Sequence, residues 1–162
     1  MPAPPRAMVF ASGVAAGGVL FALLNALKKR REGAKKQILV VHTPKASPPA
    51  GHYSQATIFG DVLTISGLLP VLPDGTKLSE KPFEAQATQV LASLRAILEA
   101  AGSCPGKLIS VRVYIADIEN WGAFNALYAK FCGEHKPARA VVPVPHLHYG
   151  LALEIEAVAA LS

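Results

Sequence analysis

Two charged residues in the stretch ARAVVPVPHLHYGLALEIEAVA, residues 138–159, are the first candidates for chemistry. The stretch reads as two extended apolar segments, with Arg139 opening the first and Glu154 inside the second. Such residues are rarely buried without a partner. A guanidinium can hold a carboxylate through two parallel hydrogen bonds, and a carboxylate beside a water can act as base and then as acid. The residues alone therefore predict either a structural ion pair or a functional site.

Three further residues of this stretch could take part in chemistry. Glu156 lies two positions beyond Glu154, so the two carboxylates share one face of an extended strand. His146 and His148 would share a face in the same way, but two histidines are too few to predict a zinc site. We expect both histidines on a surface loop, and we predict no metal site.

The composition favours one domain that acts on something other than nucleic acid. The chain has 162 residues, enough for a substantial core. Its formal net charge is +5, and much of that excess lies in KKRREGAKK at residues 28–36. Beyond this run the charges are mixed, without a basic stripe interleaved with aromatic residues, so no nucleic-acid partner is predicted.

The N-terminal segment is distinct from the rest. Residues 7–27 carry no charge and are long enough to cross about 30 Å of hydrocarbon as a helix. The basic run follows directly, which by the positive-inside rule keeps the following domain on the cytosolic side. We therefore divide the chain into a hydrophobic anchor with its basic flank, residues 1–36, and a folded domain, residues 37–162.

Other interpretations of this segment stay open. A secretory signal places its positive charge before the apolar core, whereas here the charge follows it. A cleaved mitochondrial presequence fits the absence of acidic residues before Glu32, but the apolar core lacks the usual arginines. A buried soluble helix would normally show a polar face. The mitochondrial outer membrane, the mitochondrial matrix after cleavage and the endoplasmic reticulum are the candidate locations.

Periodicity predicts the elements of the domain. Two β-rich runs in residues 56–71 flank a turn at Gly60 and Asp61, which is typical of a hairpin. Apolar residues recur every three or four positions in residues 83–101 and predict a helix. A second helix has Asn120 as its expected cap, and its apolar stripe comprises Trp121, Phe124, Tyr128 and Phe131.

Alternation predicts a strand over residues 107–117. Ser110, Arg112 and Tyr114 form its semi-polar face. The residues expected on its buried face are Ile109, Val111, Val113 and Ile115. Two more strands come from residues 138–159, broken near the prolines at 143 and 145.

The expected order is ββαβαβ with a final β, and the fold class is α+β. Two helices for five or six strands predict a mixed sheet with both helices on one face. The other sheet face would then be bare and partly apolar, which favours an oligomer that covers it.

Several motifs together resemble the RidA (YjgF-type) family of enamine/imine deaminases. They run in the expected order from about residue 48 to residue 161: AGHYSQA, ISGLLPV, QVLASLRAILEAAG, VRVYIADIENWGAFNALYAKF, PARAVV and ALEIEAVA. The resemblance implies a chorismate-mutase-like α+β fold, assembled as a homotrimer with ligand pockets between subunits. It also implies hydrolysis of 2-imino acids, such as 2-aminoacrylate and 2-iminobutanoate, to 2-keto acids and ammonia, without cofactor.

The resemblance assigns roles by position. Arg139 in PAR matches the substrate-binding arginine, and Glu154, the first glutamate of EIEA, matches the pocket carboxylate. Further substrate-binding positions are Tyr53, which a neighbouring subunit would bring to the pocket, and Ser66, Gly67, Asn125 and Val141. Taken singly, each also suits a structural position: an interface aromatic, a strand end with a bulge, or a solvated helix residue.

Departures from the family pattern bear on substrate preference more than on reaction type. Leu68 stands where glutamine is frequent, Val141 where cysteine is, Ala140 where serine is common, and His52 where proline is frequent. Together they predict a more apolar pocket. The alternatives to an imine deaminase are a non-catalytic small-molecule-binding or chaperone-like trimer and, less favoured, a nuclease or translation inhibitor.

Overall fold

The computed structural model describes residues 37–161, which lie within the compact unit Gln37–Ser162. The predicted membrane anchor, residues 1–36, lies outside these residues. Across residues 37–161, every helix is too short or too polar to cross a bilayer.

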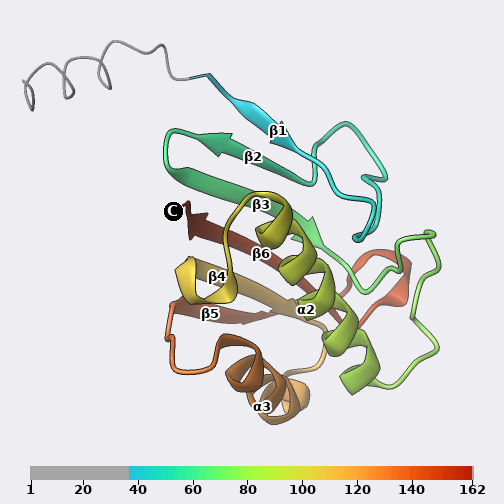
Figure 1. Cartoon of the computed structure of the whole chain (residues 1–162). Helices are drawn as coiled ribbons and strands as arrows, with labels where there is room; N and C mark the ends of the chain where they lie inside the picture. Colours follow the sequence, from blue (N-terminus) through green and yellow to red (C-terminus); the bar gives the residue numbers. More distant parts are fainter. Residues whose placement is uncertain (1–36, 162) are drawn as a thin grey trace, which may run out of the picture. The chain divides into compact units, whose positions relative to one another are not determined.

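The domain is built on one six-stranded sheet in the order β1-β2-β3-β6-β4-β5 (Figure 1). The strands are β1 Leu39–Val41, β2 Ala56–Phe59, β3 Val62–Leu68, β4 Leu108–Ile115, β5 Ala138–Pro143 and β6 Leu153–Ala160. Only β4 and β5 run parallel within this sheet, and the other neighbours are antiparallel, so the prediction of a mixed sheet is confirmed. The predicted hairpin is β2 and β3, joined through Gly60, whose φ of 64° favours glycine.

Both long helices, α2 Phe83–Ala100 and α3 Trp121–Cys132, cover the same face of the sheet (Figure 1). The helical stripe predicted for residues 83–101 is buried, with Val90, Leu94 and Leu98 fully inaccessible. In α3, Phe124 and Tyr128 are buried as predicted, but Trp121 is 45% exposed. Asn120 is the N-cap residue of α3, as predicted, but its side chain makes no capping hydrogen bond. In the short 3-10 turn Ile118–Asn120 just before α3, Asp117 accepts a hydrogen bond from the Glu119 backbone N–H.

Two local predictions about strands are wrong for physical reasons. β1 precedes the predicted first strand; its three residues are too few for alternation to be visible. Ile109, expected in the core, is 48% exposed, while Leu108 is buried. The register between β4 and β6 shifts between Leu108 and Ser110, and this irregularity exchanges the faces of the first β4 residues.

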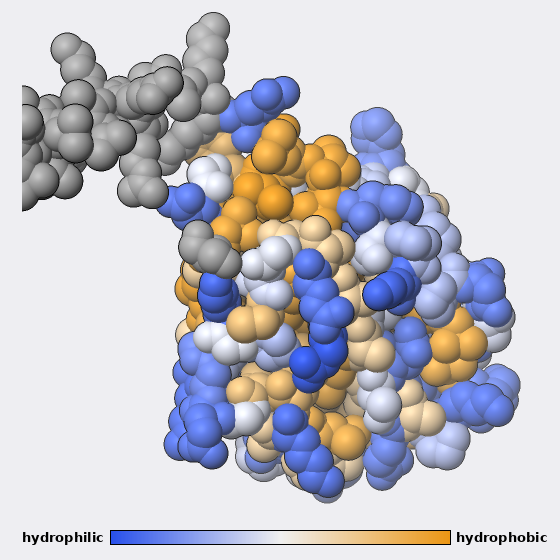
Figure 2. All heavy atoms as spheres, in the orientation of Figure 1, coloured by the Kyte–Doolittle hydropathy of each residue, from blue (hydrophilic) through white to orange (hydrophobic). Residues whose placement is uncertain are grey.

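The sheet face opposite the helices is uncovered in the single chain, and we call it the open face. Its β4 residues Arg112 and Tyr114 are exposed or half-buried, as the alternation predicted. A second apolar surface lies at the β1–β2 end of the domain, where Leu39, Val40 and Phe59 are each more than half exposed (Figure 2). In an isolated protomer, both surfaces are available for contacts with other molecules.

Candidate functional site

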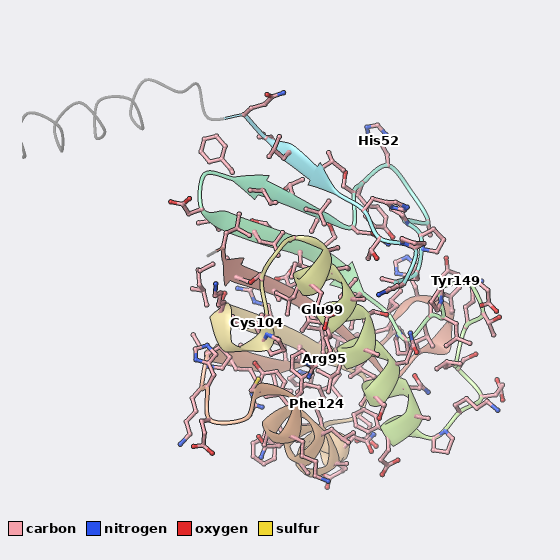
Figure 3. All side chains as sticks on the ribbon, viewed as in Figure 1. His52, Arg95, Glu99, Cys104, Phe124 and Tyr149 are labelled. Atoms are coloured by element: carbon pink, nitrogen blue, oxygen red, sulfur yellow. The ribbon has the colours of Figure 1, made fainter. Side chains whose placement is uncertain are left out.

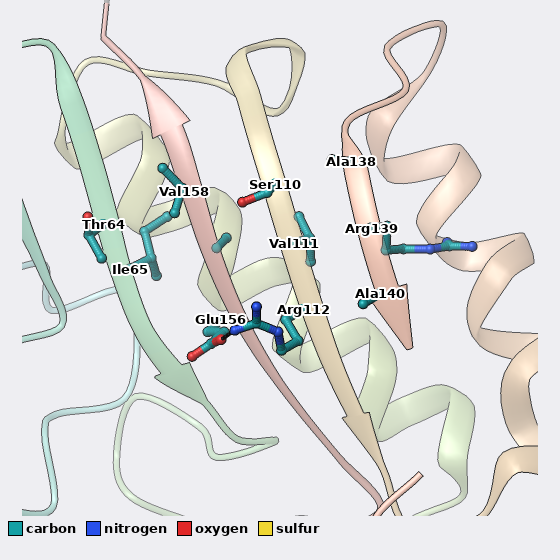
Figure 4. Close-up of a pocket in the computed structure, with 11 residues that line it drawn as sticks. Thr64, Ile65, Ser110, Val111, Arg112, Ala138, Arg139, Ala140, Glu156 and Val158 are labelled. Carbon is teal, nitrogen blue, oxygen red and sulfur yellow. Dashed lines mark hydrogen bonds and ion pairs between the residues drawn. The ribbon is translucent and has the colours of Figure 1, made fainter. Parts of the chain in front are cut away.

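Arg139 is positioned by the edge strand β5 and by helix α3. It lies opposite Val111 in the register, so its side chain leaves the sheet on the helix-covered face. One guanidinium nitrogen, Nη2, donates to Asn125 Oδ1 at 2.9 Å, and the guanidinium carbon lies 4.8 Å from the centre of the Tyr128 ring. Figure 4 shows this side chain turned toward the helix, away from Arg112 and Glu156. Stacking and one hydrogen bond thus fix the plane of the guanidinium.

A pocket of about 450 Å³ opens beside this guanidinium, and we call it the arginine pocket. Among residues 37–161, no carboxylate lies within ion-pair distance of Arg139. The remaining N–H donors therefore suit a small anion, and a carboxylate matches their fork geometry. The residues that line the pocket are Asn125, Tyr128, Ala129, Cys132, Gly133, His135, Lys136, Pro137 and Arg139.

Tyr128 and Cys132 belong to this pocket although the sequence analysis did not propose them. Tyr128 was placed only in the apolar stripe of the helix, where it also packs against Phe124. Burial raises the pKa of the Tyr128 hydroxyl and that of the Cys132 thiol above their ordinary values. Both groups are therefore neutral near pH 7, and they give the pocket weakly polar, uncharged walls. No sequence signal separates such residues from ordinary core.

Glu154 lies on the other face of the sheet. Its neighbours Leu153 and Ile155 are fully buried in the core, so alternation directs the glutamate to the open face. Its carboxylate packs directly over Gly67, where a Cβ atom would overlap it. Burial is the main cause that raises the pKa of the Glu154 carboxyl, while the charge of His148 lowers it and that of Glu156 raises it.

The residues around Glu154 come from β3 and the loops. Ser66 and Gly67 lie where the β3–β6 register shifts, so the bulge considered for them is present. The Ser66 hydroxyl donates to the Ser54 carbonyl at 2.7 Å. The Tyr53 hydroxyl accepts from the Ala50 N–H at 3.1 Å, and half of this side chain is exposed.

A pocket of about 180 Å³ joins Gly67 and Tyr53 to the loop before β6, and we call it the glycine pocket. Tyr149 forms one wall of this pocket, and its backbone φ of 63° lies in the left-handed region. Lys77 Nζ lies 4.7 Å from the centre of the Tyr149 ring. In Figure 3, Tyr149 lies well away from Phe124, the α3 residue whose ring lies near the Arg139 guanidinium. The arginine pocket and the glycine pocket are therefore separate in one chain.

The structure thus divides the predicted site residues into two groups. Arg139 and Asn125 are brought together on the helix face, whereas Glu154, Gly67 and Tyr53 gather on the other side. An ion pair between Arg139 and Glu154 is excluded within one chain, because the two side chains leave opposite faces of the sheet.

The remaining predicted positions lie outside both pockets. Val141 shares the face of Arg139 but packs against the core, and Leu68 is buried in the core. The prediction that Leu68 makes the pocket more apolar is therefore wrong. His146 and His148 are exposed on the loop before β6, as predicted.

Comparison with known proteins identifies the family. The family model described as Endoribonuclease L-PSP matches residues 43–161. A RutC family protein of Pyrococcus horikoshii is 40% identical over 120 residues, covering 74% of this chain and 95% of its own. The mitochondrial protein MMF1 of Saccharomyces cerevisiae is 36% identical over 119 residues, covering 74% of this chain and 81% of its own.

Solved structures agree with this relationship. The Yersinia pestis protein YyfA, of the conserved Rid protein family, gives a TM-score of 0.74 at 35% identity, covering 77% of this chain and all of its own. Escherichia coli TdcF, solved with bound serine, gives a TM-score of 0.72 at 33% identity, covering 76% and 99%. The chain therefore belongs to the Endoribonuclease L-PSP family, which is the RidA (YjgF-type) family that its motifs resemble.

Proposed function

We propose that this protein is a 2-iminobutanoate/2-iminopropanoate deaminase, which hydrolyses reactive 2-imino and enamino acids to 2-keto acids and ammonia. The observation that carries the proposal is the Arg139 guanidinium, oriented by Asn125 and Tyr128 and open to a pocket without a protein carboxylate. Two charge-assisted bonds from this fork would hold the carboxylate of a small imino acid. The serine bound to TdcF is a ligand of similar size with the same carboxylate.

Glu154 is the proposed proton carrier. It takes a proton from the attacking water as the oxygen bonds to C2 of the imine, and it delivers that proton to the nitrogen, which gives a carbinolamine. A second transfer through the same carboxylate moves the hydroxyl proton to the amine. The C–N bond then breaks, and ammonia and the 2-keto acid leave. A carboxyl whose pKa is raised toward neutrality suits both directions of transfer.

The complete site in this proposal needs two copies of the chain. Arg139 and Glu154 cannot face one substrate within a protomer, because they lie on opposite faces of the sheet. A homotrimer would bring the arginine pocket of one protomer against the Glu154 surface of the next, with Tyr53 at their boundary. The exposed open face favours such an assembly. No cofactor enters these steps.

The family description also names an endoribonuclease, and we do not transfer that activity. Nucleic-acid binding depends on cations that neutralise phosphates. On the open face, Arg112 is already paired with Glu156.

The second candidate is a non-catalytic binding or chaperone-like trimer that uses the same pockets. It predicts carboxylate binding or client protection without turnover.

The test is an assay with imines generated in place by a threonine or serine dehydratase, monitored as keto-acid or ammonia release. The wild-type protein should accelerate release above the buffer rate, and Arg139→Ala should abolish that acceleration. Arg95→Ala is the matched control, since Arg95 stacks on Phe131 outside both pockets. Wild-type protein that binds carboxylates but gives only the buffer rate would establish the binding alternative.

The location is a separate proposal. We propose that residues 1–36 anchor the protein in a membrane, with the domain in the cytosol; the name of yeast MMF1 favours the mitochondrion. Carbonate extraction should leave the full chain in the membrane pellet and release a chain that begins at Gln37. Full-length protein in the carbonate supernatant contradicts the anchor and favours the matrix alternative.

A further inference from the structure

The two glutamates of β6 have unequal surroundings although they share one face. The register places Tyr114 opposite Glu154 and Arg112 opposite Glu156. Both carboxylates lie on the open face, and positions two apart on a strand are separated by about 7 Å. At this distance, each ionised carboxylate opposes the ionisation of the other.

The hydrogen bonds all go to one of the two glutamates. Arg112 Nη1 donates to Glu156 Oε1 and forms an ion pair with it. The Tyr114 hydroxyl donates to the same oxygen at 3.2 Å, diagonally, rather than to Glu154 directly across the sheet. Among residues 37–161, no hydrogen bond reaches the Glu154 carboxylate, which lies over Gly67 instead. Figure 4 shows the Arg112 and Glu156 side chains meeting above the strands.

This asymmetry distinguishes the two carboxylates chemically. The Glu156 carboxylate accepts two hydrogen bonds, one of them from a guanidinium, and its charge is paired. A partly buried carboxylate without such donors binds a proton more readily, and an ionised neighbour strengthens that tendency. Pairs of carboxylates with divergent environments commonly take different roles in proton transfer.

We propose that Arg112 and Tyr114 are positioning residues that hold the Glu156 carboxylate in a charge-paired, hydrogen-bonded position and so leave proton transfer to Glu154. This inference rests on the proposed imine hydrolysis. The cation of Arg112 also compensates the charge of Glu156 and limits its effect on Glu154. Tyr114 of β4 lies directly opposite Glu154, and Arg112 of β4 lies opposite Glu156, one diagonal position away. The other titratable groups around Glu154 are Glu156 from β6, His148 from the loop before β6 and, around the glycine pocket, Lys77 and Tyr53.

The pH dependence of kcat/KM tests this arrangement through charge. Arg112→Gln leaves Glu156 uncompensated, so the acidic limb of the profile should move up by about half a pH unit. Glu156→Gln removes the like charge and leaves Arg112 free, so the limb should move down by a similar amount. The double variant carries neither charge and should return close to the wild-type profile. A purely structural role would lower activity at all pH values without opposite shifts.

A second measurement separates this inference from the proposed function. The ¹³C resonance of the Glu154 carboxyl, assigned by its loss in Glu154→Gln, reports its titration without any turnover. Its pKa should shift in the same opposite directions in the two single variants. The control Arg95→Gln, on helix α2, should leave it unchanged. Shifts of the same sign, or no shift in either variant, overturn the positioning role. If the wild-type protein is inactive but the Glu154 pKa shifts in opposite directions in the two single variants, the proposed imine hydrolysis fails, whereas the electrostatic role of Arg112 and Glu156 stands.

Discussion

Arg139 and Glu154 leave opposite faces of the same sheet, Arg139 toward helix α3 and Glu154 over Gly67. Each has its own pocket-forming neighbours, and neither forms an ion pair with the other. A site that needs both side chains must therefore combine two protomers. Because of this relationship, one chain can carry the Arg139 substitution and another the Glu154 substitution within the same oligomer.

The first prediction follows from this separation. Arg139→Ala and Glu154→Ala should each be inactive alone, but trimers assembled from an equal mixture should regain activity. If each site pairs Arg139 of one protomer with Glu154 of the next, a trimer that contains both kinds of chain keeps both side chains in one of its sites, about one third of the total. The measurement is imine hydrolysis after co-expression and purification of mixed trimers through two different tags. Mixed trimers as inactive as the single variants would show that the site is not shared.

Gly67 provides a second prediction, because the space above it belongs to the Glu154 carboxylate. In Gly67→Ala the new methyl group would displace that carboxylate. The displaced group is the end of a flexible side chain, so the melting temperature should fall only slightly, whereas kcat should fall about tenfold or more. Gly122→Ala is a matched control, since a Cβ there meets no atom within 4 Å. A Gly67→Ala protein with wild-type kcat would separate the Glu154 position from catalysis.

The sequence could predict the fold class because the strongest patterns lie in long elements. The helical stripe of residues 83–101 and the alternation of β6 both correspond to buried faces. The division of the site was not predictable, for a reason visible in β5. In its segment ARAVV, every residue except Arg139 is apolar, whichever face of the strand it lies on. No amphipathic pattern therefore shows which face the arginine takes. The resemblance implied pockets between subunits, but it did not show that Arg139 and Glu154 of one chain leave opposite faces of the sheet.

Local departures have the same kind of cause. A register shift at the start of β4 moved Ile109 to the surface, and a sequence pattern with a strict period of two cannot contain such a shift. Tyr128 was predicted as core and is buried, yet it also stacks on Arg139. Apolar periodicity reports burial, and it does not report which buried side chain borders a pocket.

A third prediction concerns the Tyr128 hydroxyl, which is buried beside the Cys132 thiol and makes no hydrogen bond of standard geometry among residues 37–161. Tyr128→Phe keeps the ring contacts with Phe124 at 5.5 Å and Phe131 at 6.4 Å. The free energy of unfolding should therefore stay unchanged or rise by up to about 1 kcal/mol, because an unsatisfied buried group is removed. Urea unfolding measures this. A clear loss of stability would mean that the hydroxyl is bound in the assembled protein, by a second protomer or by ordered water.

The fourth prediction is that Glu154 lowers stability near neutral pH. Burial raises the pKa of this carboxyl in the folded state, so the folded chain keeps a proton at pH values where the unfolded chain has released it. Stability then declines as pH rises from the unfolded value through the folded value, and it stays lower above both. Glu154→Gln cannot ionise and avoids this decline. Its melting temperature should exceed that of wild type by a few degrees at about pH 7.5, with a difference that shrinks toward about pH 4.

Glu156→Gln is the matched comparison, because the same substitution two residues away should have the opposite effect. Glu156 accepts hydrogen bonds from Arg112 and Tyr114, and its charge is paired with that of Arg112. Losing that charge leaves Arg112 unpaired and should lower the melting temperature near neutral pH. Thermal unfolding of both variants across the pH range measures the contrast. If Glu154→Gln were destabilising at about pH 7.5 and Glu156→Gln were not, the ionised Glu154 carboxylate would not be the one that destabilises the folded state. The assignment of proton transfer to Glu154 would then lose its physical basis.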